Sequence, residues 1–162
     1  MAASFTPVED DLYREIILDH YRKPRHSGRV SDPTAVVEAN NPLCGDEITL
    51  TLRSDGSTVT DVAFEGQGCS ISQASASMLC DAVIGLRNDD AAVLAAQFRD
   101  MLVSDGPAPD AGDLEALQGV KAYPVRVKCA TLAWNALLQA IRGEPVHQRT
   151  TLVEGHDDRG GA

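Results

Sequence analysis

The sequence predicts an α+β fold in which a small antiparallel three-stranded sheet is covered by helices. Three runs of alternating apolar and polar residues, typical of half-buried strands, fall within residues 35–68. Beyond residue 69 the apolar spacing changes to about 3.6 residues, which is the helical period. At 162 residues the chain fits one domain with its own core. We expect this domain to span residues 1–150 and residues 151–162 to form a disordered tail.

A helix is predicted first, over residues 7–21. Leu12 and Ile16 lie on one face at helical spacing, acidic residues occupy the first turn, and Pro24 terminates the pattern. The stretch "HSGRVSDPT" that follows is rich in turn-forming residues and is predicted to be a loop.

The three strands follow that loop. The middle strand alternates most clearly, with Ile48, Leu50 and Leu52 on one face and polar or charged residues on the other. The stretch "SDGST" after it is typical of a hairpin turn, so we expect the strands to form an antiparallel meander. The expected strands are residues 35–40, 47–54 and 59–68.

Helices are predicted for most of the remaining chain. The stretch "SISQASASMLCDAVIGL" has a helical pattern rich in Ala and Ser, and the next helix is capped by Asn88 or Asp89. The stretch "SDGPAPDAGD" is expected to be an exposed and mobile loop. A long closing helix is expected to stop at Gly143 and Pro145, and Met78 and Trp134 are expected in the core. The expected helices are residues 70–86, 88–102, 113–120 and 124–143.

Composition and charge argue against several classes of function. Fourteen basic and twenty-four acidic side chains give a net charge of −10, which disfavours binding to phosphate backbones or anionic lipids. No apolar run approaches the roughly 20 residues that cross a bilayer, and the first residues lack the pattern of a secretion signal. We therefore expect a cytoplasmic protein that binds neither nucleic acid nor membrane.

Four cysteines need an explanation in a reducing compartment, where structural disulfides are rare. Cys44, Cys69 and Cys129 each lie at an element boundary, and Asp46 follows Cys44 in the same turn. Side chains at loop ends and helix starts can converge on one point, and helix N-termini favour the thiolate form. Cys80 lies within a predicted helix and is expected to be a buried, inert thiol.

Three thiolates and one carboxylate suit a tetrahedral zinc site or iron–sulfur chemistry. The spacing alone is weakly specific, because separations of 25 and 60 residues match no zinc-finger pattern. Isolated buried thiols, and a turn or capping role for Asp46, are therefore open alternatives. Glycines beside these residues allow a close approach of the backbone to another group, although the same pattern is expected for ordinary turn glycines after strands.

Four segments of the chain resemble one known family. "LYREIILDHYRKPRHSG", "NPLCGD", "GQGCSISQASASML" and "VRVKCATLAW" resemble the SufU proteins, which are zinc-dependent sulfur acceptors within the IscU-like (NifU N-terminal) family of iron–sulfur cluster assembly proteins. The resemblance runs from about residue 12 to residue 142, and the family's α+β fold agrees with the fold predicted above. Scaffold members carry a histidine before the last cysteine, where this chain has Lys128, and residues 104–121 resemble an insertion that scaffolds lack.

The resemblance implies a ligand set and a mechanism. Cys44, Asp46, Cys69 and Cys129 would bind one Zn²⁺ ion, and Cys44 would accept sulfur. The donor would be a persulfide on a SufS-type cysteine desulfurase, a pyridoxal-phosphate enzyme, and a histidine of that enzyme would replace Cys44 as ligand and free its thiolate to attack. Arg126, one helical turn before Cys129, resembles a family arginine that pairs with Asp46 or steers the persulfide; the alternative is a solvated helix face.

The implied activity is that of a zinc-dependent sulfurtransferase, a persulfide carrier that activates the desulfurase and supplies sulfur to downstream SUF cluster-assembly proteins. Two alternatives stay open at this point. One is an iron–sulfur cluster assembly scaffold, and the other is a domain whose zinc only stabilises the fold.

Overall fold

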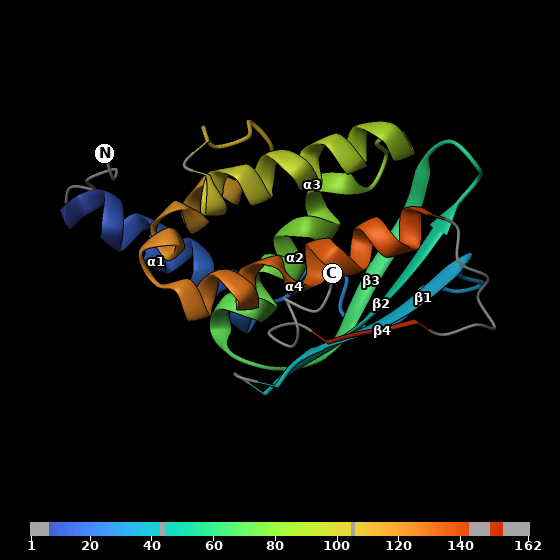
Figure 1. The fold of residues 1–162 in the computed structure, drawn as a ribbon, viewed down its shortest axis with the longest axis horizontal. Coiled ribbons are helices and arrows are strands. Elements are labelled where there is room, and N and C mark those ends of the chain that lie inside the picture. Colours follow the sequence, from blue (N-terminus) through green and yellow to red (C-terminus); the bar gives the residue numbers. More distant parts are fainter. Residues whose placement is uncertain (1–6, 43–44, 105, 143–149, 154–162) are drawn as a thin grey trace.

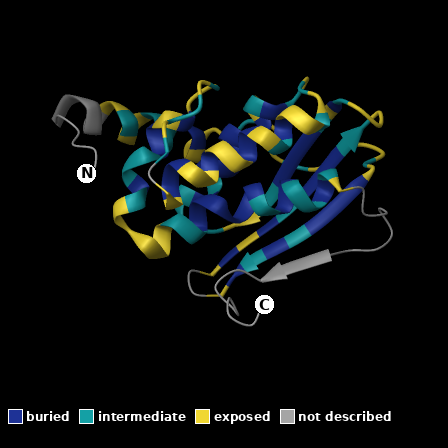
Figure 2. Ribbon diagram, turned by 45° about the horizontal axis from the view of Figure 1, so that its top comes forward, coloured by how far each residue is buried: buried dark blue, intermediate teal, exposed yellow. Residues whose placement is uncertain are grey.

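A computed structural model describes residues 7–42, 45–104, 106–142 and 150–153. The protein has an α+β fold in which helices gather on one face of a sheet with strand order β3-β2-β1-β4 (Figure 1). The buried residues concentrate where the helices meet the sheet (Figure 2). The predicted fold class is therefore confirmed. No helix within the described ranges has both the length and the apolar character needed to cross a membrane.

The first three strands form the predicted antiparallel meander. Ile48, Leu50 and Leu52 are buried against the helices, as their alternation predicts. The turn between the second and third strands is closed by Asp55, whose Oδ1 accepts the backbone N–H groups of Ser57 and Thr58. These hydrogen bonds hold the pKa of the Asp55 carboxyl below its usual range. The strands are β1 (Ala35–Asn41), β2 (Asp46–Ser54) and β3 (Val59–Gln67).

A fourth strand, β4 (Thr150–Val153), pairs in parallel with β1. The sequence predicted that residues 151–153 belong to a disordered tail, so this part of the prediction is wrong. The predicted disorder rests on the polar, glycine-rich end of the chain, whereas Thr-Thr-Leu-Val is a segment of strand-forming residues. It also gives hydrogen-bond partners to the outer edge of β1. Residues 154–162 lie outside the described residues.

The predicted helices are confirmed to within a few residues. The predicted end of α2 at residue 86 is too late. The N–H of Gly85 donates to Val59 O and the N–H of Val59 donates to Leu86 O. These bonds to the first residue of β3 take the place of helical hydrogen bonds and end the helix. The short helix before Pro124 is a 3₁₀ helix. The helical segments are α1 (Pro7–Arg22), α2 (Ser70–Val83), α3 (Asn88–Val103), η1 (Leu114–Ala122) and α4 (Pro124–Ile141).

The core between the helices and the sheet contains Met78 and Trp134, as predicted. The Trp134 ring stacks on Phe98 of α3, with ring centroids 4.7 Å apart and an angle of 17° between the planes. Cys80 is also fully buried, and burial raises the pKa of its thiol far above the usual range. Cys80 is therefore the inert thiol that the sequence predicted.

One buried histidine joins three segments of the chain. His20 of α1 is almost fully buried, and its Nδ1 lies 2.7 Å from Ser77 Oγ of α2. Its Nε2 lies 2.8 Å from Asp113 Oδ2, just before η1. Since the backbone N–H of Arg25 also donates to Ser77 Oγ, this cluster fixes the end of α1 against α2.

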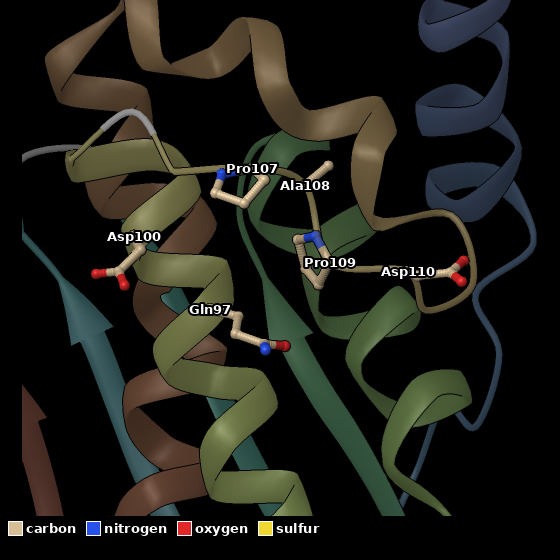
Figure 3. A pocket seen from close by; sticks show the side chains of 6 residues that line it. All are labelled: Gln97, Asp100, Pro107, Ala108, Pro109 and Asp110. Carbon is tan, nitrogen blue, oxygen red and sulfur yellow. The ribbon is translucent and has the colours of Figure 1, made fainter.

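The segment between α3 and η1 is less exposed than the sequence predicted, because Ala108 and Ala111 pack against the core. It borders a hollow of about 220 Å³ (Figure 3). The carboxylates of Asp100 and Asp110 point away from each other (Figure 3), and neither belongs to a group of candidate metal ligands among the described residues. The hollow is lined by Gln97, Asp100, Pro107, Ala108, Pro109 and Asp110.

Candidate metal centre

Asp46 is the first residue of β2 and is fully buried. It pairs with Asn41, the last residue of β1, so it lies where the hairpin connection between the two strands returns to the sheet. Asp46 Oδ1 accepts the backbone N–H of Cys69 at 3.0 Å. Asp46 Oδ2 has no hydrogen-bond partner among the described residues. A buried carboxylate oxygen without a partner is costly in a folded protein, so this atom marks a position where a cation would be stabilised.

Cys69 is the N-cap of α2, the boundary position that the sequence indicated. Its Sγ accepts the backbone N–H of Ser72 at 3.4 Å, in the way that a serine or aspartate side chain caps a helix. The pKa of the Cys69 thiol is lowered to about 5, chiefly because the Cys129 thiol donates a hydrogen bond to it, with a further contribution from the Ser72 N–H. Partial burial and the nearby Asp46 carboxylate act in the opposite direction. The hydrogen bonds at Cys69 therefore favour its thiolate form.

Cys129 lies in the second turn of α4 and is fully buried. Its Sγ is 3.6 Å from Val125 O, one turn earlier in the same helix. The sequence placed this cysteine near a helix start, and the structure adds that its buried Sγ lies within 4.8 Å of Cys69 Sγ. Two helices thus contribute one sulfur each to the same point.

The ligand atoms of Asp46, Cys69 and Cys129 all lie within 4.8 Å of one another. A tetrahedral zinc ion with bonds of about 2.0–2.3 Å holds its ligand atoms roughly 3.3–3.8 Å apart. Small side-chain shifts would therefore bring all three onto one ion. Two sulfurs and one carboxylate oxygen are donors that zinc accepts, and the unpartnered Asp46 Oδ2 supplies a free acceptor. The residues present fit a zinc ion.

The sequence predicted four ligands, and the structure brings three of them together. Cys44, the fourth, lies outside the described residues. Its neighbour Gly45 has a φ of +70°, a left-handed conformation that favours glycine, and donates its N–H to Asn41 O at 2.9 Å. Arg126 is exposed on the first turn of α4, and Lys128 is half-buried next to Cys129. Of the histidines, His20 belongs to the separate cluster under α1.

The site requires a glycine at position 68. In the sequence this glycine indicated only that the backbone could approach another group closely. A Cβ atom added at Gly68 would overlap Asp46 Oδ1 and Ser72 Oγ. The absence of a side chain therefore lets the Asp46 carboxylate reach the start of α2. The signal available in the sequence was the position of Gly68 directly before Cys69.

Replacing Gly68 with alanine is expected to weaken metal binding by at least about tenfold, because the new methyl group pushes the Asp46 carboxylate off the Cys69 N–H. Competition with a chromophoric chelator measures this affinity. Gly112→Ala is the control for adding a methyl group where no atom lies within 4 Å, and because its φ of +55° adds backbone strain, the thermal unfolding of both variants is measured as well. Equal metal affinities for the Gly68→Ala and native chains would contradict the role given to Gly68.

Comparison with known proteins gives consistent matches over most of the chain. The sequence profile of the NifU-like N terminal domain matches residues 12–148. The zinc-dependent sulfurtransferase SufU of Bacillus subtilis (strain 168) is 48% identical over 143 residues, covering 87% of this chain and 97% of that protein. The iron-sulfur cluster assembly scaffold protein IscU of Streptococcus pyogenes serotype M1 is 44% identical over 142 residues, covering 86% of this chain and 89% of that protein.

A solved structure is similar over the same region. It is the putative iron-sulfur cluster assembly scaffold protein for the SUF system from Fervidobacterium islandicum AW-1. The two structures have a TM-score of 0.74 at 34% sequence identity, covering 78% of this chain and 94% of that chain. Both the sequence and the arrangement of elements are therefore shared with proteins of iron–sulfur cluster assembly.

Proposed function

Because this chain belongs to the NifU-like N-terminal domain family, we propose that it is a zinc-dependent sulfurtransferase that accepts persulfide sulfur from a SufS-type cysteine desulfurase for iron–sulfur cluster assembly. The observation that carries the proposal is the convergence of Asp46, Cys69 and Cys129 within 4.8 Å from three different elements. The name of the Bacillus subtilis relative, a zinc-dependent sulfurtransferase, supports the same activity.

The proposed ligand set is Cys44, Asp46, Cys69 and Cys129, with Cys44 also the sulfur acceptor. Two residues of chain span at most about 7 Å, so Cys44 is within reach of an ion held at Asp46. The described residues on either side of positions 43–44, Pro42 and Gly45, are exposed. In the proposed ligand set, Asp46 and Cys129 are the buried ligands.

In the proposed reaction, the Cys44 thiolate attacks the terminal sulfur of the desulfurase persulfide. A new S–S bond forms between Cys44 Sγ and that sulfur, the S–S bond on the desulfurase breaks, and the desulfurase cysteine leaves as a thiolate. No electrons or protons are needed beyond those exchanged between the two cysteines. Zinc, when bound, would keep the ligand thiols deprotonated at neutral pH. The guanidinium of Arg126, exposed one turn before Cys129, is proposed to steer the anionic persulfide.

A scaffold for cluster assembly is the second candidate, favoured by the Streptococcus pyogenes relative that carries the scaffold name. An iron–sulfur cluster has to be held by several protein ligands at once, so a missing ligand weakens a scaffold role. The presence of Lys128 where scaffold members are expected to have histidine favours the sulfurtransferase for this chain. Both candidates use the same cluster of side chains, so metal content separates them.

The first test is the metal and acid-labile sulfide content of the chain purified without oxygen, followed by transfer of labelled sulfur from cysteine in the presence of a SufS-type desulfurase. We expect about one zinc per chain, no iron, no colour, and label on the chain. Iron with matching sulfide and a brown solution would instead favour the scaffold. Zinc without sulfur transfer would leave only a fold-stabilising ion and would contradict the proposal.

A further inference from the structure

Two of the candidate ligands are on different helices, so the packing of α2 against α4 sets their separation. Cys69 caps the start of α2, and Cys129 lies in the second turn of α4. The two helices lie against each other on the helix-covered face of the sheet (Figure 1). A fixed link between them close to the two sulfurs would decide whether both reach one ion.

Ser75 of α2 makes such a link. Its hydroxyl donates to the backbone carbonyl of Ala130 at 2.6 Å and accepts the indole N–H of Trp134 at 3.1 Å. All three residues are fully buried. A buried hydroxyl that both donates and accepts is held in one orientation, and hydrogen bonds of this kind are strengthened by the low local dielectric.

The link acts on the turn of α4 that carries the ligand. Ala130 directly follows Cys129, so a hydrogen bond to its carbonyl restrains the same turn of backbone. Trp134 lies one turn further along, and helical side chains lean back toward the N-terminus, which brings the indole over Ala130 and Ser75. The indole is itself fixed by stacking on Phe98.

We propose that Ser75 is a positioning residue, whose hydroxyl holds α4 in register with α2 so that the Cys69 and Cys129 sulfurs stay within reach of one metal ion. This inference rests on the zinc site of the proposed function. It adds to that site a side chain that touches neither the ion nor the sulfur.

Ser77 provides a matched control. It is on the same helix and equally buried, but its hydroxyl bonds to His20 Nδ1 and to the Arg25 N–H, both in the α1 region. Both variants therefore remove a hydroxyl from a fully buried serine of α2. Ser77→Ala breaks a link to the α1 region, whereas Ser75→Ala breaks the link to α4. A loss of stability alone would be common to both variants, whereas a loss of metal affinity would belong to Ser75→Ala.

The test measures zinc affinity by chelator competition and thermal unfolding for the full-length native chain, Ser75→Ala and Ser77→Ala. Zinc affinity is expected to fall about 10- to 100-fold in Ser75→Ala, as for loss of a residue that orients a ligand, and to stay native in Ser77→Ala. Trp134→Phe removes the indole N–H together with part of the buried ring that stacks on Phe98, so its loss of zinc affinity is compared with its loss of stability and should not be additive with the loss in Ser75→Ala. Native zinc affinity in Ser75→Ala would overturn the inference.

Backbone amide hydrogen exchange, measured on the chains as purified, tests the role of Ser75 independently of the proposed zinc-dependent function. Ser75→Ala is expected to raise exchange of the α4 amides around Cys129 above the level seen in Ser77→Ala. If the native chain bound no zinc, the proposed function would fail, and the exchange of α4 would still decide the role of Ser75. Identical exchange of α4 in the two variants would contradict the inference even if the native chain binds zinc.

Discussion

Replacing Cys44 with serine is expected to abolish sulfur acceptance while leaving the chain folded. The oxygen of serine is protonated at neutral pH and is a poor nucleophile toward sulfur, so no persulfide can form there. In the sequence the substitution falls between β1 and β2, and the described residues on either side, Pro42 and Gly45, are exposed. Transfer of ³⁵S from cysteine by the desulfurase, followed on a non-reducing gel, measures the effect.

Cys80→Ala is the control for this experiment. Cys80 is fully buried and its thiol has a strongly raised pKa, so its removal is expected to leave sulfur transfer unchanged. Label on the Cys44→Ser chain equal to that on the native chain would mean that another thiol is the acceptor. Cys69, whose pKa is lowered to about 5, would then be the next residue to test.

Replacing Cys69 with serine is expected to cost more zinc affinity than the roughly 10- to 100-fold that follows loss of a residue outside the ligand shell. Serine is among the best N-cap residues, so its hydroxyl can accept the Ser72 N–H that Cys69 Sγ accepts now. The start of α2 should therefore be preserved while the soft thiolate ligand is lost. Isothermal titration with zinc, with circular dichroism to verify helix content, measures both expectations.

The same variant separates a functional zinc site from one that only stabilises the fold. If zinc only stabilised the fold, Cys69→Ser should melt at the same lowered temperature as the metal-free native chain, and neither the native chain nor the variant should accept sulfur at Cys44. If the proposed function is correct, sulfur transfer should fall together with zinc affinity. A variant that binds no zinc yet accepts sulfur at the native rate would contradict the coupling of the two.

Much of the fold could be predicted from the sequence because its elements have strong local patterns. The alternation of Ile48, Leu50 and Leu52 predicts a half-buried strand, and the change of period at residue 69 marks the start of α2. The end of α2 was misplaced because it depends on the pairing of Gly85 and Leu86 with Val59, a contact between distant residues. The parallel strand β4 was missed for the same reason.

The candidate site could be predicted only in part. The positions of Cys69 and Cys129 at element boundaries predicted that they converge, with Asp46 an open candidate that the family resemblance favoured as a ligand. The sequence could not indicate that Gly68 makes room for the Asp46 carboxylate, or that Ser75 joins α2 to α4. Both depend on the distance between two elements after folding, which no local pattern records.

The candidate ligands are far apart in the sequence, and this separation sets the order in which they become available during synthesis. Cys129 follows Cys69 by 60 residues, and a ribosome adding about 5–20 residues per second takes roughly 3–12 s to make that stretch. During this interval the emerging chain contains the residues of the hairpin and α2 but not the helix that carries Cys129. The proposed zinc site could be completed only after translation of α4, so any folding that precedes it would take place without the full set of ligands.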